Sequence, residues 1–404
     1  MFPGWRVVGG VFGLMAIACG LGFYNASVYL QVMVADRGIS VVAASGASAT
    51  FFVTFGLAGV PISRWLTGRD PRPVILAGGV VGGVALLGLT SATAAPQLYV
   101  SFAVFGLAFA AVSFVPGTTL VTRWFVRRRA LALTVATTGL SVGGIVITPL
   151  SASAIERSGL EVVGPWLALG WTVGIWLVTW AAIRPSPQAL GLEPDGDPRP
   201  EDGAVPVTGM APGAAYRTRT FRYLTAGASL MMLTQIGALA HLYPIGVERA
   251  DAATGALAVT TVAVASIVGR FAGVWVLRHL DALRFMTLLG VFQALAMGLL
   301  AVEAGAVGVL VAVAVFGLAV GNLLVLIPVV IVESFGGAHY PSIYAMIQLV
   351  STVGIAAGPI LFGAARQASG GYGAGALAAA VVSLVSAAVL VAASRARQRE
   401  PAGV

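Results

Sequence analysis

Long apolar runs recur along the whole chain, and they are the feature that most constrains its fold. A helix needs roughly 20 residues at 1.5 Å per residue to cross a bilayer. Because lipid cannot hydrogen-bond to a bare backbone, such runs predict membrane-spanning helices. The sequence predicts an all-α membrane protein with twelve transmembrane helices, at residues 7–35, 41–65, 73–94, 97–122, 130–155, 164–183, 220–247, 252–277, 284–304, 306–332, 340–366 and 373–394.

Composition excludes a soluble protein. Charged residues make up 9% of the 404 residues, against roughly a quarter in soluble proteins, and apolar residues make up 58%. The mean hydropathy is +0.94. A soluble core of this length could not hold so much apolar surface, so the lipid bilayer must cover the rest.

One long polar segment divides the chain. Residues 184–219 are rich in Pro, Gly and acids and show no apolar period. We expect a cytoplasmic linker with little regular structure of its own. It separates an N-terminal six-helix bundle at 1–183 from a C-terminal six-helix bundle at 220–404.

The placement of the basic residues predicts the orientation. With the N-terminus inside, most of the arginines fall in cytoplasmic segments, and the outer loops keep only Arg37, Arg157, Arg249 and Arg366. This satisfies the positive-inside rule and places both termini in the cytoplasm.

Other classes of protein find little support. The net charge of +8 comes entirely from arginine, and no basic stripe with interleaved aromatic residues indicates nucleic-acid binding. The chain shows no catalytic dyad, no His/Cys metal cluster and no Walker or Rossmann glycine pattern, so we expect no enzyme, no cofactor and no metal. It also lacks the charged ring of a channel. We expect a monomer.

The two halves share a pattern of small residues. Gly139 and Gly143 precede a proline in one half, and Gly354 and Gly358 precede a proline in the other. Small residues at this spacing let two helix backbones approach closely. Their repetition favours a transporter built from two pseudo-symmetric bundles that rock about a central site.

Several motifs carry a resemblance to a known family. The stretch 123–132, followed by Gly139 and Gly143, resembles the fourth-loop and fifth-helix signature of the monocarboxylate transporters and their bacterial relatives, within the major facilitator superfamily. Further matches are Gly4-Trp5, Arg72-Pro73-Val74, His241-Leu242-Tyr243-Pro244, Gly269-Arg270 and Gly358-Pro359. The resemblance implies the major facilitator fold, transport by alternating access, and a bacterial inner-membrane location.

The second-loop motif of that superfamily is altered here. The motif residues are Arg64, Arg69, Asp70 and Arg72, but Thr67 stands where the family carries an acid. Asp70 could replace that acid after a local shift. The resemblance implies that this loop takes part in gating.

Arg270 is the one charged residue in the interior of a predicted span, because the other charges within the spans lie near their ends. It lies about 10 Å from the cytoplasmic end of its helix at 1.5 Å per residue. It could snorkel to the interface or bond to backbone carbonyls. It could instead bind an anion bidentately through its planar guanidinium, the role that the resemblance implies.

Further polar residues could complete a substrate site, although ordinary helix packing explains each of them singly. The candidates are Tyr24, Asn25, Tyr29, Asn322, Tyr344 and Gln348. The oxalate–formate exchangers, a more distant resemblance, carry a second cation in the eleventh helix. Span 340–366 offers none in its interior, so we expect a small organic anion with one carboxylate.

His241 is the conventional candidate for proton coupling, because the interiors of the spans contain no acidic residue. It could equally bond to interfacial water, or the substrate itself could bring the proton. We expect proton-coupled transport of a monocarboxylate, so the expected partners are the anion and H⁺. The alternative is efflux of a drug or metabolite by the same fold.

Overall fold

The computed structural model describes residues 2–196, 208–302 and 305–400, and nearly all of them are helical. The predicted linker residues 197–207 and the end of predicted span 284–304 lie outside the described residues, as do the charges of Asp197, Arg199, Glu201, Asp202 and Glu303. The chain divides into two compact units, residues 1–207 and 208–404, and the division falls inside segment 184–219.

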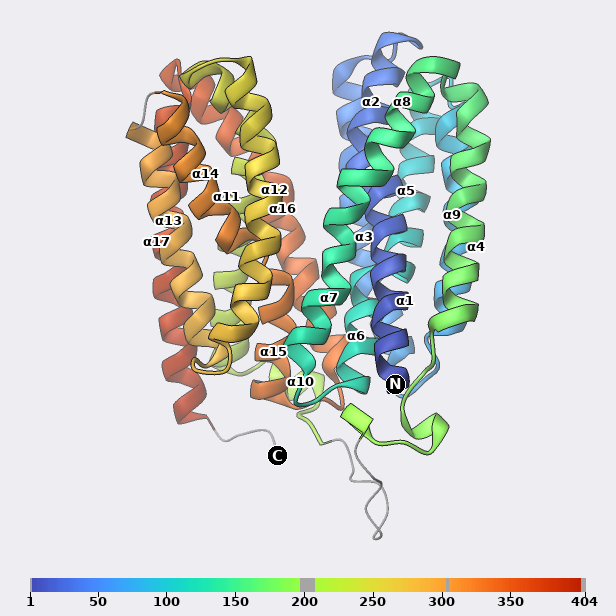
Figure 1. Cartoon of the computed structure of the whole chain (residues 1–404), viewed down its shortest axis with the longest axis vertical. Coiled ribbons are helices and arrows are strands. Elements are labelled where there is room, and N and C mark those ends of the chain that lie inside the picture. Colours follow the sequence, from blue (N-terminus) through green and yellow to red (C-terminus); the bar gives the residue numbers. More distant parts are fainter. Residues whose placement is uncertain (1, 197–207, 303–304, 401–404) are drawn as a thin grey trace. The chain divides into compact units, whose positions relative to one another are not determined.

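The first unit contains thirteen helical elements among its described residues (Figure 1). They are α1 (Pro3–Ala18), η1 (Cys19–Tyr24), α2 (Asn25–Ala35), α3 (Val41–Leu66), α4 (Arg72–Ser91), α5 (Ala95–Val112), α6 (Phe114–Trp124), α7 (Arg129–Val142), η2 (Gly143–Ile147), α8 (Thr148–Ser158), α9 (Leu160–Ala182), η3 (Gln188–Leu190) and η4 (Pro194–Gly196). The segments η1 and η2 are π-helical insertions inside long helices, whereas η3 and η4 are short 3₁₀ turns.

The described part of the second unit contains eight helices (Figure 1). They are α10 (Pro212–Ala215), α11 (Arg219–Arg249), α12 (Ala252–Val276), α13 (Ala282–Val302), α14 (Ala306–Val320), α15 (Leu323–Phe335), α16 (Tyr340–Ser369) and α17 (Tyr372–Arg399).

The described residues contain twelve helical stretches that are long and apolar enough to cross a membrane, and six belong to each unit. This confirms the predicted all-α membrane fold, and the chain is a multi-pass integral membrane protein. Large apolar side chains on the outside fit a lipid environment: Trp180 is 82% exposed and Leu150 is 67% exposed.

Glycines hold the same pair of helices together in each unit. In the first unit, a methyl group on Gly139 or Gly143 would strike the Phe12 or Ala16 carbonyl oxygen of α1. In the second unit, a methyl group on Gly354 or Gly358 of α16 would strike the Ser229 or Leu233 carbonyl oxygen of α11. The predicted close approach through small residues is confirmed at both places.

The described part of segment 184–219 has more local structure than the sequence predicted. Asp195, at a φ of 61°, accepts hydrogen bonds from the backbone N–H groups of Val126, Arg127 and Arg128, at 2.7–3.2 Å. These N–H groups precede α7, where a helix has unpaired donors and favours a carboxylate. The first part of segment 184–219 is therefore bonded to the first unit through Asp195. The sequence did not predict this contact, because the segment has no apolar period.

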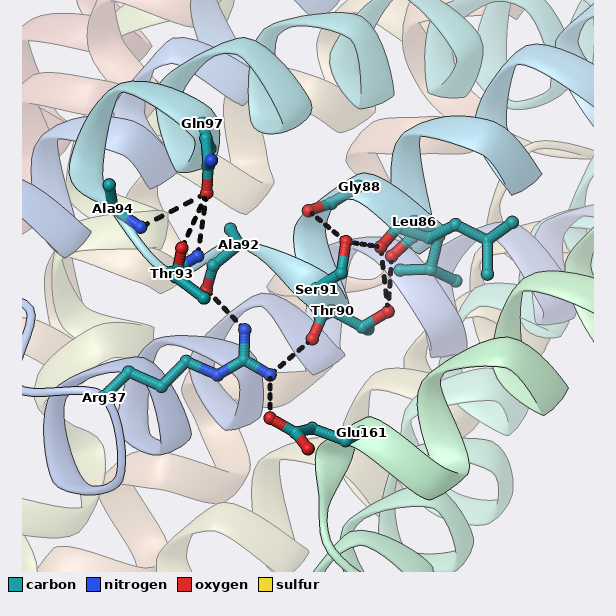
Figure 2. A network of polar contacts seen from close by, with 11 residues as sticks. Arg37, Leu86, Gly88, Thr90, Ser91, Ala92, Thr93, Ala94, Gln97 and Glu161 are labelled. Atoms are coloured by element: carbon teal, nitrogen blue, oxygen red, sulfur yellow. Dashed lines mark hydrogen bonds and ion pairs between the residues drawn. The ribbon is translucent and has the colours of Figure 1, made fainter.

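Arg37, predicted from the sequence to lie in an outer loop, has a structural role, shown in Figure 2. The Arg37 guanidinium donates to the carbonyls of Thr90, at 2.6 Å, and Ala92, and it pairs with Glu161 at 3.6 Å. These carbonyls end α4, and the last carbonyls of a helix lack partners within it. Arg37 thus ties the end of α4 to the beginning of α9.

Candidate functional site

A break in a membrane helix organises the polar residues of the second unit. α14 ends at Val320 and α15 begins at Leu323, so one predicted span is interrupted at Gly321 and Asn322. The Asn322 N–H donates to the Ala319 carbonyl, and the Asn322 carbonyl accepts from two later N–H groups. Breaks of this kind expose backbone carbonyls that other groups must satisfy, and in transporters they often lie near binding sites.

Arg270 lies against this break. It belongs to α12, is 3% exposed, and donates from Nε to the Gly321 carbonyl at 3.0 Å. Gly321 has to be small, because a methyl group there would strike the Ser266 carbonyl oxygen and lie 2.8 Å from Arg270 Cγ. The bond to Nε fixes one edge of the guanidinium. Arg270 therefore makes the backbone contact that sequence reasoning allowed, and binding of a substrate anion stays a prediction.

Asn322 joins the same two helices from the other side. Its Nδ2 donates to the Gly269 carbonyl at 3.0 Å and to the Leu318 carbonyl at 2.9 Å. Its Oδ1 lies where a side chain on Gly273 would be. The structure thus brings Arg270 and Asn322 together at one contact between α12 and the broken helix.

Sequence analysis missed a third member of this cluster, Gln235 of α11. Its Nε2 donates to the Val320 carbonyl at 3.1 Å, and its buried Oε1 has no hydrogen-bond partner among the described residues. The signal was available, since an amide inside a membrane span needs hydrogen-bond partners from neighbouring helices. Two neighbouring carbonyls at the break are therefore satisfied by side chains from two different helices.

Tyr344 and Gln348 lie on α16 of the same unit and are buried. The Tyr344 ring stacks on Tyr340 with centroids 5.5 Å apart. The Oε1 of Gln348, like those of Gln235 and Gln293, is a buried amide oxygen without a hydrogen-bond partner in the described part of the chain. An unsatisfied buried polar atom costs about 1–3 kcal/mol, so such an atom is a candidate for contact with a ligand.

The three candidates of the first unit gather around the π-helical segment η1. Asn25 bonds through Nδ2 and Oδ1 to the Ser151 hydroxyl, at 2.7 and 2.9 Å, and its Nδ2 also lies 3.2 Å from the Tyr29 hydroxyl oxygen. Tyr29 donates to the Leu21 carbonyl at 3.0 Å. The ring of Tyr24 lies close to Gly144. The polar atoms of Asn25 and Tyr29 are thus engaged within the unit, and their contact with substrate stays a prediction.

His241 is held at both ring nitrogens. Nδ1 lies 3.2 Å from the Tyr372 hydroxyl, and Nε2 lies 3.1 Å from the Pro359 carbonyl oxygen. The ring stacks on Phe362 at 5.5 Å. A neutral ring can make both bonds, with Nε2 donating to the Pro359 carbonyl and Nδ1 accepting from the Tyr372 hydroxyl. In a protonated ring Nδ1 would carry a hydrogen and could no longer accept from that hydroxyl. No hydrogen bond to water is needed to satisfy the ring.

The loop motif between α3 and α4 is ordered by two arginines. Asp70 pairs with Arg72 at 2.7 Å and accepts the Arg72 N–H at 2.9 Å. Burial opposes ionisation of Asp70, but the bonds and charge of Arg72 outweigh it and lower the pKa of the Asp70 carboxyl. The Arg123 guanidinium donates to the carbonyls of Leu66 and Arg69.

The remaining motif residues lie at the surface of this loop. The guanidinium of Arg69 lies 6.0 Å from the Trp65 ring centroid, and Arg64 is exposed. The hydroxyl of Thr67, the residue in the family's acid position, donates to the Ser63 carbonyl. Asp70 makes the charged contact of the loop, and its part in gating stays a prediction.

Twelve helices long enough to span a membrane in the described residues, six in each unit, with a buried cation at a helix break, are typical of membrane transporters. The family model of the Major Facilitator Superfamily matches residues 11–359. The chain belongs to this superfamily, as the motifs indicated.

Curated relatives and a solved structure agree with this assignment. The chain is similar to the mouse (Mus musculus) monocarboxylate transporter 11, 26% identical over 77% of this chain and 69% of the relative. It is similar to the rat (Rattus norvegicus) monocarboxylate transporter 3, 28% identical over 88% of this chain and 72% of the relative. The Escherichia coli fucose:proton symporter has the same fold, with a TM-score of 0.71 at 15% identity over 98% of both chains.

Proposed function

We propose that this protein is a secondary active transporter that moves a small organic anion, a monocarboxylate, across the membrane by alternating access. The observation that carries the proposal is the burial of Arg270 at the break between α14 and α15. A charged side chain at the centre of a membrane helix costs about 2.5–3.5 kcal/mol, so intramembrane arginines are retained for function. The similarity to monocarboxylate transporters supports the substrate class.

The geometry of Arg270 suits carboxylate recognition. With Nε held by the Gly321 carbonyl, the plane of the guanidinium is oriented before substrate arrives. A planar fork that is already oriented binds a carboxylate with less loss of side-chain entropy than a flexible ammonium does. Tyr344 and Gln348 are further proposed contacts, as are Asn322 and the first-unit residues Tyr24, Asn25 and Tyr29.

Proton coupling is part of the proposal. The described spans place no acidic side chain in the interior of a helix, and His241 is a titratable group within one of them. Protonation of His241 would change its bond to Tyr372, which gives the proton a structural effect. The distribution of arginines supports an orientation with both termini in the cytoplasm, and the motif resemblance is the basis for proposing a bacterial inner-membrane location.

The decisive experiment measures uptake of a panel of radiolabelled carboxylates into proteoliposomes with an imposed pH gradient. Truncating one member of a buried charge pair costs about 2–5 kcal/mol, so Arg270→Gln should reduce monocarboxylate uptake at least about thirtyfold. Arg270→Lys keeps the positive charge but lacks the planar guanidinium, so its uptake should lie between that of the wild type and that of Arg270→Gln. Arg278→Gln is the matched control, because it removes an exposed arginine just beyond the same helix.

Three results would contradict the proposal. Undiminished uptake by Arg270→Gln would show that Arg270 does not bind the substrate. Preference for a dicarboxylate over lactate would show that the substrate is not a monocarboxylate. Outward transport of substrate that does not respond to the pH gradient would favour the efflux alternative. Thermal melting of each variant before reconstitution shows whether the loss of the Gly321 bond has unfolded the protein.

A further inference from the structure

A groove lies at the arginine-rich end of the first unit, and none of the proposed substrate contacts lines it. It has a volume of about 930 Å³ and runs between α4 and α9, with α1 at one side. Three guanidinium groups line it, those of Arg6, Arg72 and Arg184, and one carboxylate, that of Asp70. Three positive charges against one negative charge leave a surplus of two.

The wall of the groove changes from charged to apolar along α9. Trp176, Leu177 and Trp180 line it and are 47%, 61% and 82% exposed. The Trp176 indole N–H donates to the Leu76 carbonyl of α4, which fixes its ring across the two helices. Tryptophans at the end of a span are typical of the membrane interface, where the head groups meet the acyl chains.

Two of the arginines are held by neighbouring groups. Arg72 pairs with Asp70, and Arg184 donates to the carbonyls of Trp180 and Ile183 at the end of α9. Their guanidinium groups are therefore positioned beside the groove before a ligand binds. Arg6 of α1 is exposed and supplies a third cation.

The second unit repeats this arrangement. A smaller groove of about 420 Å³ lies between α13 and α17, the third and sixth spans of that unit, as α4 and α9 are of the first. Arg284, near the beginning of α13, and Arg395, near the end of α17, line it together with Leu288 and Val391. Two sequences that differ in most positions thus place arginines beside apolar residues at corresponding grooves.

We propose that the groove between α4 and α9 binds the phosphate head group of an anionic phospholipid, with an acyl chain along Leu76 and Leu177. The ligand class follows from the chemistry. A basic pocket between membrane helices, at the end of the spans, suits a lipid phosphate, and the exposed apolar wall suits its tail. A free phosphate would use the arginines but would leave the apolar wall without a function.

The test titrates the detergent-solubilised full-length protein with phosphatidylglycerol, phosphatidylcholine or inorganic phosphate and counts bound lipid by native mass spectrometry. The wild type should retain phosphatidylglycerol in preference to phosphatidylcholine. One arginine near a phosphate is worth about fivefold in affinity, so Arg6→Gln and Arg184→Gln should each weaken phosphatidylglycerol binding about fivefold. Arg157→Gln, an exposed arginine at the opposite end of the unit, is the control and should bind as the wild type does.

Arg184→Gln removes the bonds to the Trp180 and Ile183 carbonyls and could prevent folding. Arg6 is exposed, so Arg6→Gln tests the groove without this complication. Equal retention of the two lipids would overturn the proposal, as would unchanged affinity in Arg6→Gln. Displacement of the lipid by inorganic phosphate would show a phosphate site instead. A dimer that Arg6→Gln dissociates would show that a second copy of the chain covers the groove.

Discussion

The contact between α11 and α16 predicts a large difference between two chemically identical substitutions. Gly358 of α16 faces the backbone of α11, and a methyl group on it would strike the Leu233 carbonyl oxygen and lie 2.9 Å from the Gly237 nitrogen. Backbone atoms cannot rotate away as a side chain would, so Gly358→Ala must separate the helices. Gly298 of α13 belongs to the same unit, and nothing lies within 4 Å of the methyl group that Gly298→Ala would add.

Overpacking of this kind costs about 1–3 kcal/mol. For a unit of this size, each kcal/mol lowers the melting temperature by about 2–4 °C, so Gly358→Ala should melt about 2–12 °C below the wild type. Gly298→Ala should melt at the wild-type temperature or slightly above it, because alanine favours a helix over glycine by up to about 1 kcal/mol. Thermal melting of the purified protein measures both, and equal melting of the two variants would refute the backbone-contact argument.

Three further predictions concern the polar contacts. Because the pKa of Asp70 is lowered in the folded protein, its bonds to Arg72 stabilise the fold above the usual pKa of 3.8. This stabilisation is lost as the pH falls through the lower folded-state pKa. The melting temperatures of wild type and Asp70→Asn should therefore differ at pH 6 and converge only under strong acid. Asn25→Ala should lower the free energy of unfolding by about 1–3 kcal/mol in denaturant titration, because it leaves the Ser151 hydroxyl in a buried site without its amide partner, and an unchanged midpoint would contradict this. His241→Ala should flatten the pH dependence of uptake without abolishing it, and a wild-type pH profile in proteoliposomes would show that the proton is carried elsewhere.

The twelve spans could be predicted because hydropathy over about 20 residues is a local property. The interruptions within them could not. The predicted span 97–122 is broken at Ser113, and span 306–332 is broken at Gly321. The π-helical segment η1 packs against η2 where Gly20 meets Gly143, a contact between residues far apart in sequence. Such distortions depend on a partner helix, so no local pattern announces them.

The candidate site could also be predicted only in part, because its side chains are visible in the sequence but their backbone partners are not. Arg270 was found because a charge in an apolar span is visible in the sequence. Its partner, the Gly321 carbonyl, is a backbone atom and has no signature of its own. Asn25 and Tyr29 share a helix face, as their spacing indicates, but their bonds to Ser151 and Leu21 depend on the π-helical turn.

The Arg37 contact has a mechanical consequence. One guanidinium joins the loop after α2, the last turn of α4 and the first turn of α9, so separating these three ends breaks two hydrogen bonds and one ion pair (Figure 2). A rearrangement of the first unit that preserves these contacts moves the three ends together. Amide hydrogen exchange at all three ends should therefore be faster in Arg37→Met than in the wild type.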